Sequence, residues 1–185
     1  MKKCMEILII TILIITPSLM FGCQTKQEAT TMADQQQPSN PYYSHSDTSV
    51  LNIPNSVWKK VLSASVYAVA RNKETEPAFT GKYSDFESLG TYYCAACGNK
   101  LFRSDAKFSS TCGWPSFFET VRQGAVVYQP DGSYGMKRIE VLCGRCGSHL
   151  GHLFDDGPPP TGKRYCMNSI VLEFVPDDAT HQQGQ

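Results

Sequence analysis

The sequence has no excess of charge of either sign. Its 185 residues include 17 lysines and arginines and 17 aspartates and glutamates, and the basic residues form no cluster. A nucleic-acid-binding surface needs concentrated positive charge, so this class of function is not indicated. The length suits one domain with appended segments rather than two full domains.

The sequence also lacks an apolar run long enough to cross a membrane. Its longest run, residues 7–21, would rise about 22 Å as a helix, against about 30 Å for a hydrocarbon core. Lys2 and Lys3 precede the run, so residues 1–22 are predicted to be a secretory signal peptide. Its ending, MFGC, resembles bacterial lipoprotein signals. This implies a lipidated Cys23 and an extracytoplasmic, membrane-anchored protein, on the periplasmic side or at the cell surface; plain cleavage is the alternative.

Residues 23–52 lack hydrophobic periodicity and contain few aliphatic side chains. Such a segment buries too little surface to offset the conformational entropy lost on folding, so we predict a disordered polar linker. The folded domain is predicted over residues 53–178, followed by a flexible tail of residues 179–185. The domain has no internal repeat apart from two similar cysteine motifs.

The domain is predicted to be mainly β. One short N-terminal helix is expected within residues 56–72, with Ser56 as its N-cap. Short strand-like runs with frequent glycines follow it, and the sequence QPDGS predicts a hairpin turn between residues 126–128 and 134–136. Because no helices separate these runs, we expect antiparallel sheets.

Four of the eight cysteines form two C-x-x-C-G motifs, CAACG and CGRCG. The two-residue spacing directs both sulfurs of a motif to one corner of a tetrahedron, and the glycine permits the tight turn. Two such motifs predict a closed structural zinc site, with iron as the lesser alternative. The predicted ligands are Cys94, Cys97, Cys143 and Cys146.

Two other interpretations of these motifs exist. Because exported proteins fold in an oxidising environment, two structural disulfides are an alternative to the metal site. A thioredoxin-like redox motif is less supported, because no β-α-β pattern surrounds either pair. A structural zinc site contributes about 10–16 kcal/mol, which is comparable to the net stability of a whole domain, about 5–15 kcal/mol.

Cys166 stands apart from these motifs, near the start of a strand-like run. His149 and His152 lie in a Gly- and Pro-rich segment before it, which predicts a loop, and strand alternation places Asn168 on the same face as Cys166. A thiol is only a few per cent ionised at neutral pH, so a nucleophile needs such neighbours, and Arg164 would lower its pKa. A small buried structural cysteine is an equally supported interpretation.

Several motifs together resemble the methionine-R-sulfoxide reductase B family. They are AFTGKY, YYCAACG, LFRSDAKFSSTCGWPSFFE and HLGHLFDDGPPPTGKRYCMNS, and the resemblance covers about residues 79–175. It implies two antiparallel sheets in a β-tent-like arrangement, a structural zinc ion and no organic cofactor. A monomer is expected.

The resemblance also implies a mechanism. Cys166 attacks the sulfur of methionine sulfoxide, in proteins or peptides, while a histidine protonates the oxygen, and Cys166 becomes a sulfenic acid. Cys112, at the family's recycling position, then forms a disulfide with Cys166 that a thioredoxin-like donor reduces. The other implied site residues are the catalytic His149, His152 and Asn168 and the substrate-binding Trp114, Phe154 and Arg164.

Two further hypotheses use the same cysteines differently. Cys112 and Cys166 could form a permanent disulfide in an exported zinc-binding module, or exchange disulfides with other proteins. If the chain is exported, a catalytic thiol must be re-reduced in an oxidising environment, so an extracytoplasmic reductant is expected.

Overall fold

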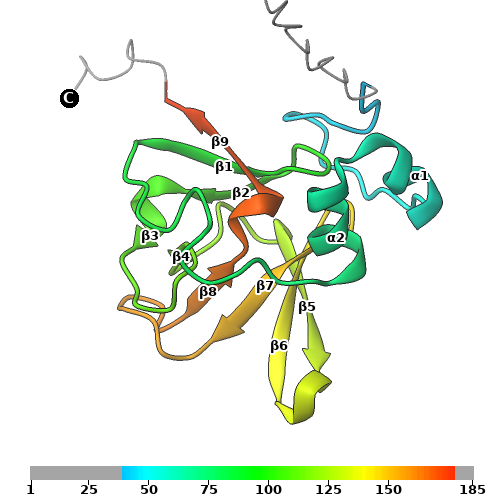
Figure 1. Cartoon of the computed structure of the whole chain (residues 1–185). Coiled ribbons are helices and arrows are strands. Elements are labelled where there is room, and N and C mark those ends of the chain that lie inside the picture. Colours follow the sequence, from blue (N-terminus) through cyan, green and yellow to red (C-terminus); the bar gives the residue numbers. More distant parts are fainter. Residues whose placement is uncertain (1–38, 178–185) are drawn as a thin grey trace, which may run out of the picture. The chain divides into compact units, whose positions relative to one another are not determined.

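The computed structural model describes residues 39–177 (Figure 1). The predicted signal peptide, the lipidation site Cys23 and the predicted tail of residues 179–185 lie outside the described residues. Within residues 39–177, no helix has the length and apolar character needed to cross a membrane.

Two short helices open the domain, where one was predicted. Helix α1 spans Asn55–Val61 and helix α2 spans Ala64–Asn72. The chain breaks between them because the Ser63 hydroxyl accepts a hydrogen bond from the backbone N–H of Val66 at 3.3 Å, which makes Ser63 the N-cap of α2. The predicted N-cap, Ser56, lies inside α1 instead.

Two antiparallel sheets form the rest of the domain, which confirms the predicted mainly β fold. The first has the order β2-β1-β9, with β1 at Gly90–Cys94, β2 at Lys100–Arg103 and β9 at Leu172–Pro176. The second has the order β3-β4-β8-β7-β6-β5. Its strands are β3 Lys107–Phe108, β4 Ser116–Phe117, β5 Val126–Asp131, β6 Arg138–Cys143, β7 His149–Phe154 and β8 Arg164–Met167.

The core contains large side chains from both sheets and from α1. Phe102 of β2 and Phe117 of β4 stack with ring centroids 4.3 Å apart, and Trp58 of α1 is fully buried. Helix α2 packs on β7 and on the 3-10 turn Ser169–Val171 (Figure 1). Burial of these apolar side chains is the main favourable contribution to the stability of the fold.

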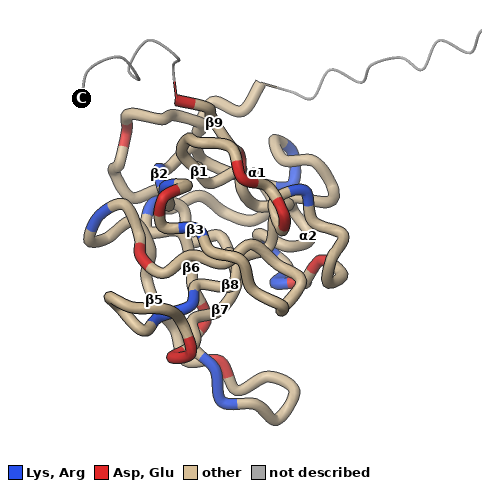
Figure 2. Tube along the Cα trace, turned by 90° about the vertical axis from the view of Figure 1, so that its left-hand side faces the viewer, with Lys and Arg blue, Asp and Glu red and all other residues tan. Residues whose placement is uncertain are grey.

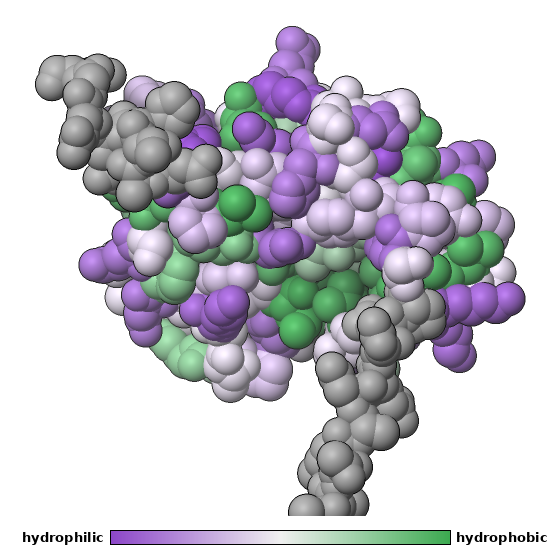
Figure 3. Space-filling view, turned by 90° about the horizontal axis from the view of Figure 1, so that it is seen from above, coloured by the Kyte–Doolittle hydropathy of each residue, from purple (hydrophilic) through white to green (hydrophobic). Residues whose placement is uncertain are grey.

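The surface matches the balanced composition. Acidic and basic residues are interspersed along the chain (Figure 2). On the face seen in Figure 3, hydrophobic side chains gather in small groups among hydrophilic ones.

Three local predictions around the site are wrong. The histidine-containing segment is strand β7, not a loop, because it pairs with both β6 and β8. The run around Cys166 is not one strand: β8 and β9 belong to different sheets, and the turn Ser169–Val171 between them ends the simple alternation of faces. The hairpin is present, but residues 134–136 belong to its turn and not to the second strand.

The linker prediction is also wrong over residues 39–52, which pack on the domain. Asn40 Nδ2 donates to the Ala96 carbonyl at 2.8 Å, and the Ser44 N–H donates to the Cys97 carbonyl at 3.0 Å. The ring of His45 stacks on Tyr93 with centroids 4.0 Å apart. The segment is ordered by hydrogen bonds to both cysteine motifs and by packing of Tyr42 and Leu51 on the core, which a test of overall apolar content does not detect. The rest of the predicted linker lies outside the described residues.

Candidate active site and metal centre

The four cysteines of the C-x-x-C-G motifs converge on one point, as predicted. Their sulfurs all lie within 4.8 Å of one another, and all four residues are buried. Cys94 and Cys146 have their Sγ atoms 3.8 Å apart, and those of Cys97 and Cys143 are 3.6 Å apart. Four sulfurs around a tetrahedral zinc ion lie about 3.8 Å from one another. The residues therefore fit a metal ion, and all four are free thiols rather than disulfides.

The two motifs link the two sheets. Cys94 is the last residue of β1 and Cys143 is the last residue of β6, so the site joins the three-stranded sheet to the six-stranded one. Gly98 and Gly147 have φ angles of 76° and 67°, in the left-handed region that the predicted turns require. Their N–H groups donate to the carbonyls of Cys94 and Cys143.

The pKa values of the buried thiols are shifted in opposite directions. Hydrogen bonds with Cys146 and then with Cys94 lower the pKa of Cys143, whereas a hydrogen bond with Cys143 raises that of Cys94. Metal ligation requires thiolates, so a cation at this point would displace protons from the cluster.

The other two cysteines of the domain lie side by side at a different place. Cys166 lies on β8, and the residue paired with it on β4 is Ser116. Cys112 lies in the turn before β4, and its Sγ is 3.5 Å from the Sγ of Cys166. Both residues are partly exposed. The structure thus brings together the two thiols that the resemblance paired.

The surroundings of these two thiols affect their ionisation in opposite directions. Burial raises the pKa of Cys112, but hydrogen bonds with Ser110 and Ser116 outweigh it and bring that pKa down to about 7. Burial, and then the neighbouring Cys112, raise the pKa of Cys166 to about 12. Arg164 lowers the pKa of Cys166, as expected, but by less than these opposing effects.

The register of the strands places polar side chains on one face. Cys166 is paired with His152 of β7, which is paired with Glu140 of β6, and directly paired residues share a face. His149 would point to the opposite face of a regular strand. However, the register shifts by one residue here: Gly151 pairs with Val141, while His149 pairs with Leu142. This β-bulge brings the two histidine rings to within 5.4 Å on the same face.

Gly151 has a second role between the histidines. A Cβ atom at this position would lie 2.0 Å from the carbonyl oxygen of Cys166. Only glycine therefore allows β7 to approach β8 this closely, which sets His152 beside Cys166.

Each histidine is held by a carboxylate that was not predicted from the sequence. His149 Nδ1 lies 2.7 Å from Glu140 Oε1, and His152 Nε2 lies 2.8 Å from Asp131 Oδ2. Arg138 donates to the same Asp131 oxygen at 2.7 Å. Burial lowers the pKa of His149, although Glu140 opposes the shift, so the neutral ring is favoured. The sequence does contain a signal for Arg138 and Glu140: two charged residues stand at alternate positions of a predicted strand, and so on one face of it.

A cavity of about 110 Å³ opens beside Cys166. The predicted residues that line it are Trp114, His152, Phe154, Cys166 and Asn168. Trp114 is fixed because its Nε1 donates to the Glu76 carbonyl at 3.1 Å. The Asn168 amide donates to the Leu150 carbonyl at 3.0 Å and accepts from the Glu76 N–H at 3.0 Å.

Three predicted residues do not line this cavity. His149 lines a larger adjoining hollow, and Cys112 lies behind Cys166. Arg164 binds Asp156 through two hydrogen bonds of 2.8 and 2.9 Å and covers the ring of Phe154 at 4.3 Å from its centroid. Its position indicates that it orients Phe154 rather than contacting a molecule in the cavity.

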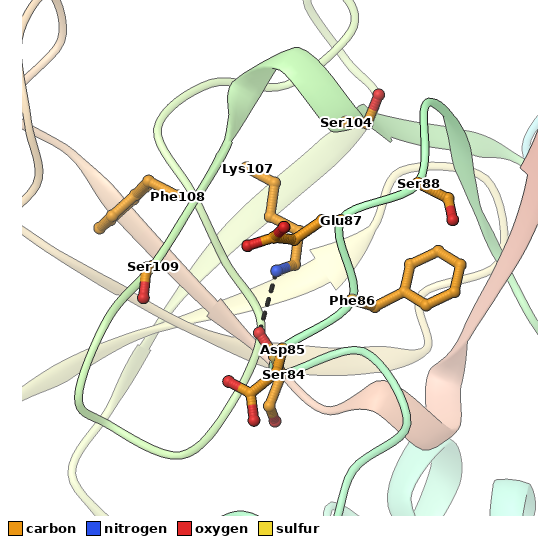
Figure 4. A pocket seen from close by; sticks show the side chains of 9 residues that line it. All are labelled: Ser84, Asp85, Phe86, Glu87, Ser88, Ser104, Lys107, Phe108 and Ser109. Carbon is orange, nitrogen blue, oxygen red and sulfur yellow. Dashed lines mark hydrogen bonds between the residues drawn. The ribbon is translucent and has the colours of Figure 1, made fainter.

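Another hollow has no cysteine in its lining (Figure 4). Lys107 extends into it and donates to the Ser84 carbonyl at 2.9 Å, while Asp85 and Glu87 lie nearby. Burial lowers the pKa of Lys107, and the two carboxylates oppose this shift. None of the predicted site residues lines this hollow.

Known proteins resemble this chain over the domain. The family model described as the SelR domain matches residues 62–176. A peptide methionine sulfoxide reductase MsrB of Leptospira interrogans is 55% identical over 117 residues, which cover 63% of this chain and 89% of the relative. That of Methanosarcina mazei is 52% identical over 128 residues, 69% of this chain and 91% of the relative. The mitochondrial methionine-R-sulfoxide reductase B3 of Mus musculus is 48% identical over 126 residues, which cover 68% of this chain and 50% of the relative.

Proposed function

Because the chain belongs to the SelR domain family, it is a peptide-methionine (R)-S-oxide reductase, and we propose that Cys166 is the nucleophile of this reaction. The observation that carries the proposal is the position of Cys166. It lies in a cavity walled by Trp114 and Phe154, with the thiol of Cys112 3.5 Å behind it. An aromatic wall suits the methyl-thioether end of methionine, and a cavity of about 110 Å³ suits it better than a protein disulfide.

The first step transfers oxygen from the substrate to Cys166. The Cys166 sulfur attacks the sulfoxide sulfur, the S–O bond of the substrate breaks, and the protonated oxygen passes to the Cys166 sulfur. The transient bond between the two sulfurs then breaks, so methionine leaves and Cys166 becomes a sulfenic acid. One proton must reach the oxygen, and the raised pKa of Cys166 means that the thiol itself carries this proton in the free protein. His152 lines the same cavity and is placed to pass the proton from sulfur to oxygen.

The second step forms a disulfide. The Cys112 thiolate attacks the sulfur of the Cys166 sulfenic acid, the hydroxyl leaves as water after taking up a proton, and a Cys112–Cys166 disulfide remains. Cys112 suits this role because its pKa of about 7 makes it a thiolate near neutral pH. A thioredoxin-like donor then returns both cysteines to thiols by disulfide exchange.

The cysteine-rich metal centre has a structural part in this proposal. Zinc is the metal that four buried thiolates in a tetrahedral arrangement favour. When bound, zinc cross-links β1 and β6 and therefore fixes the two sheets against each other.

The location of the enzyme is a separate proposal from the sequence. Residues 1–22 form a signal peptide, Cys23 is lipidated, and the monomeric domain repairs oxidised exported proteins outside the cytoplasm. Labelled fatty acid in the purified protein, lost in a Cys23→Ala variant, would test the anchor. A protein without lipid would overturn it.

Stereospecific reduction of methionine sulfoxide is the test of the activity and of the two steps. The reduced chain is mixed with an excess of a peptide containing either the R or the S epimer, without another reductant. We expect the R epimer to yield one methionine per chain and to consume the thiols of Cys112 and Cys166, mapped by mass spectrometry. Equal yields from both epimers, or no oxidation of the protein, would overturn the proposal.

A further inference from the structure

Three ionisable side chains form a line that begins at the surface and ends beside the cavity. Lys73, the C-cap residue of α2, donates from Nζ to Glu140 Oε2 at 2.8 Å. The other oxygen of Glu140, Oε1, lies 2.7 Å from His149 Nδ1. The side chains of Glu140 and His149 are only 4% and 3% exposed, whereas that of Lys73 is 55% exposed.

The far end of this line is a buried nitrogen without a partner. His149 Nε2 is buried and makes no hydrogen bond with any described residue. Leaving such an atom unsatisfied in the protein interior is unfavourable, so its position calls for an explanation. His149 lies on the same face of the sheet as His152 and Cys166, and its ring is 5.4 Å from that of His152. The hollow that His149 lines adjoins the Cys166 cavity at Arg138 and His152, so a polar group of a bound substrate is the partner that this place offers.

We propose that Lys73 and Glu140 are positioning residues that fix the tautomer of His149, with the proton on Nδ1 and Nε2 free to accept a hydrogen bond. The carboxylate of Glu140 can only accept, so the nitrogen that faces it must carry the hydrogen. Lys73 donates to the other oxygen of Glu140 and so holds the carboxylate in one orientation. Nε2 then accepts from the hydroxyl group that forms when the sulfoxide oxygen takes up its proton. This inference rests on the proposed function.

His152 offers an internal contrast. Its Nε2, not its Nδ1, faces a carboxylate, that of Asp131, which Arg138 also binds. The two histidines are therefore held through opposite nitrogens. By the same rule Nε2 of His152 carries a hydrogen, so Nδ1 is the nitrogen of His152 that can exchange a proton in the cavity.

The tautomer can be measured without any catalysis. Imidazole nitrogen chemical shifts of ¹⁵N-histidine-labelled protein separate protonated from unprotonated nitrogens. We expect His149 to carry its proton on Nδ1 in the wild type. In Glu140→Gln the amide can donate to Nδ1 instead, so the proton should move partly or wholly to Nε2. An unchanged His149 spectrum in this variant would overturn the proposal.

Kinetics provide the second readout. Glu140→Gln should lower the rate of the first turnover about 10-fold or more, with little change in KM, because a hydrogen bond of the reacting state is lost. Glu87→Gln, a charge-matched change in the hollow of Figure 4, is the control and should leave the rate unchanged. A thermal stability loss in Glu140→Gln with an unaltered rate would show a purely structural role and overturn the proposal.

Substitution of Lys73 provides a second test if Glu140→Gln does not fold. The Lys73 side chain is half exposed, so its replacement disturbs the fold less. Lys73→Met should slow the first turnover a few-fold, and Lys73→Arg should restore it. Equal rates for Lys73→Met and wild type would overturn the part assigned to Lys73. If the wild type itself reduces no methionine sulfoxide, the proposed function fails, while the His149 spectrum still reports separately on the tautomer.

Discussion

The six cysteines of the described domain form two groups with opposite surroundings. The four of the C-x-x-C-G motifs are buried and face one another, whereas Cys112 and Cys166 are partly exposed and lie among hydroxyl groups beside a cavity. Four buried sulfurs that face one another favour a permanently bound cation. Partial exposure with unequal ionisation favours a pair that reacts. Under the proposed function, cysteine therefore serves structure at one place and redox chemistry at another.

Removing one buried ligand should give the largest effect. Cys94→Ser leaves three thiolates around a metal that contributes about 10–16 kcal/mol, so we expect loss of bound metal and of most of the folding stability. Metal content by mass spectrometry and thermal unfolding would measure both. Full metal occupancy in Cys94→Ser would contradict the four-cysteine centre, and Cys112→Ser, which alters the other group, is the control.

The reactive pair should respond to substitution in a different way. Cys166→Ser should abolish the first turnover, by on the order of 1,000-fold or more, because the attacking atom is lost. Cys112→Ser should keep one turnover, since Cys166 remains, but lose recycling by thioredoxin. Both variants should keep their metal. Rapid-quench measurement of methionine release would separate the roles, and identical behaviour of the two variants would show that the roles are assigned wrongly.

Alkylation would sharpen the comparison within the pair. The pKa of Cys112 is lowered to about 7, so its thiolate predominates at pH 8, whereas the pKa of Cys166 is raised to about 12 and its thiol stays protonated there. Iodoacetamide should therefore label Cys112 first at pH 8, and below pH 7 its rate should fall about 10-fold per pH unit. Peptide mapping measures both sites. Ser110→Ala, which removes a hydrogen bond that lowers the pKa, should slow the labelling.

Features that depend on the spacing of neighbouring residues were predictable from the sequence. Features that depend on contacts between distant segments were not. The C-x-x-C-G motifs specify the metal centre because each motif forms its own turn. Cys112 and Cys166 are 54 positions apart, and only the resemblance joined them before the structure placed their sulfurs together. The position of His149 depends on the bulge in β7, which exists only when β6 is alongside. Glu140 and Lys73 are 67 positions apart and meet because α2 packs on the sheet.

The same distinction explains the two errors near the N-terminus. The Ser63 cap is a local signal that could have divided the predicted helix. The order of residues 39–52 is not local, since it depends on groups of the cysteine motifs more than fifty positions away. Arg145 of the second motif donates to the carbonyls of Tyr42 and Cys97, each at 2.6 Å, and to Asp47 Oδ2 at 2.6 Å.

Substitution in these contacts should give the smallest effect. It concerns how residues 39–52 shield the metal centre from a chelator. Residues 39–52 precede the SelR match, and their bonds to Ala96, Cys97 and Arg145 place them against the metal-binding motifs. Asp47→Asn weakens the hold of Arg145, so we expect a chelator to remove the metal a few-fold faster, with the first turnover unchanged. Asp155→Asn removes a surface pair with Lys163 and is the control. If both variants release metal at the wild-type rate, the segment does not protect the centre, and the two cysteine groups differ only in their own burial.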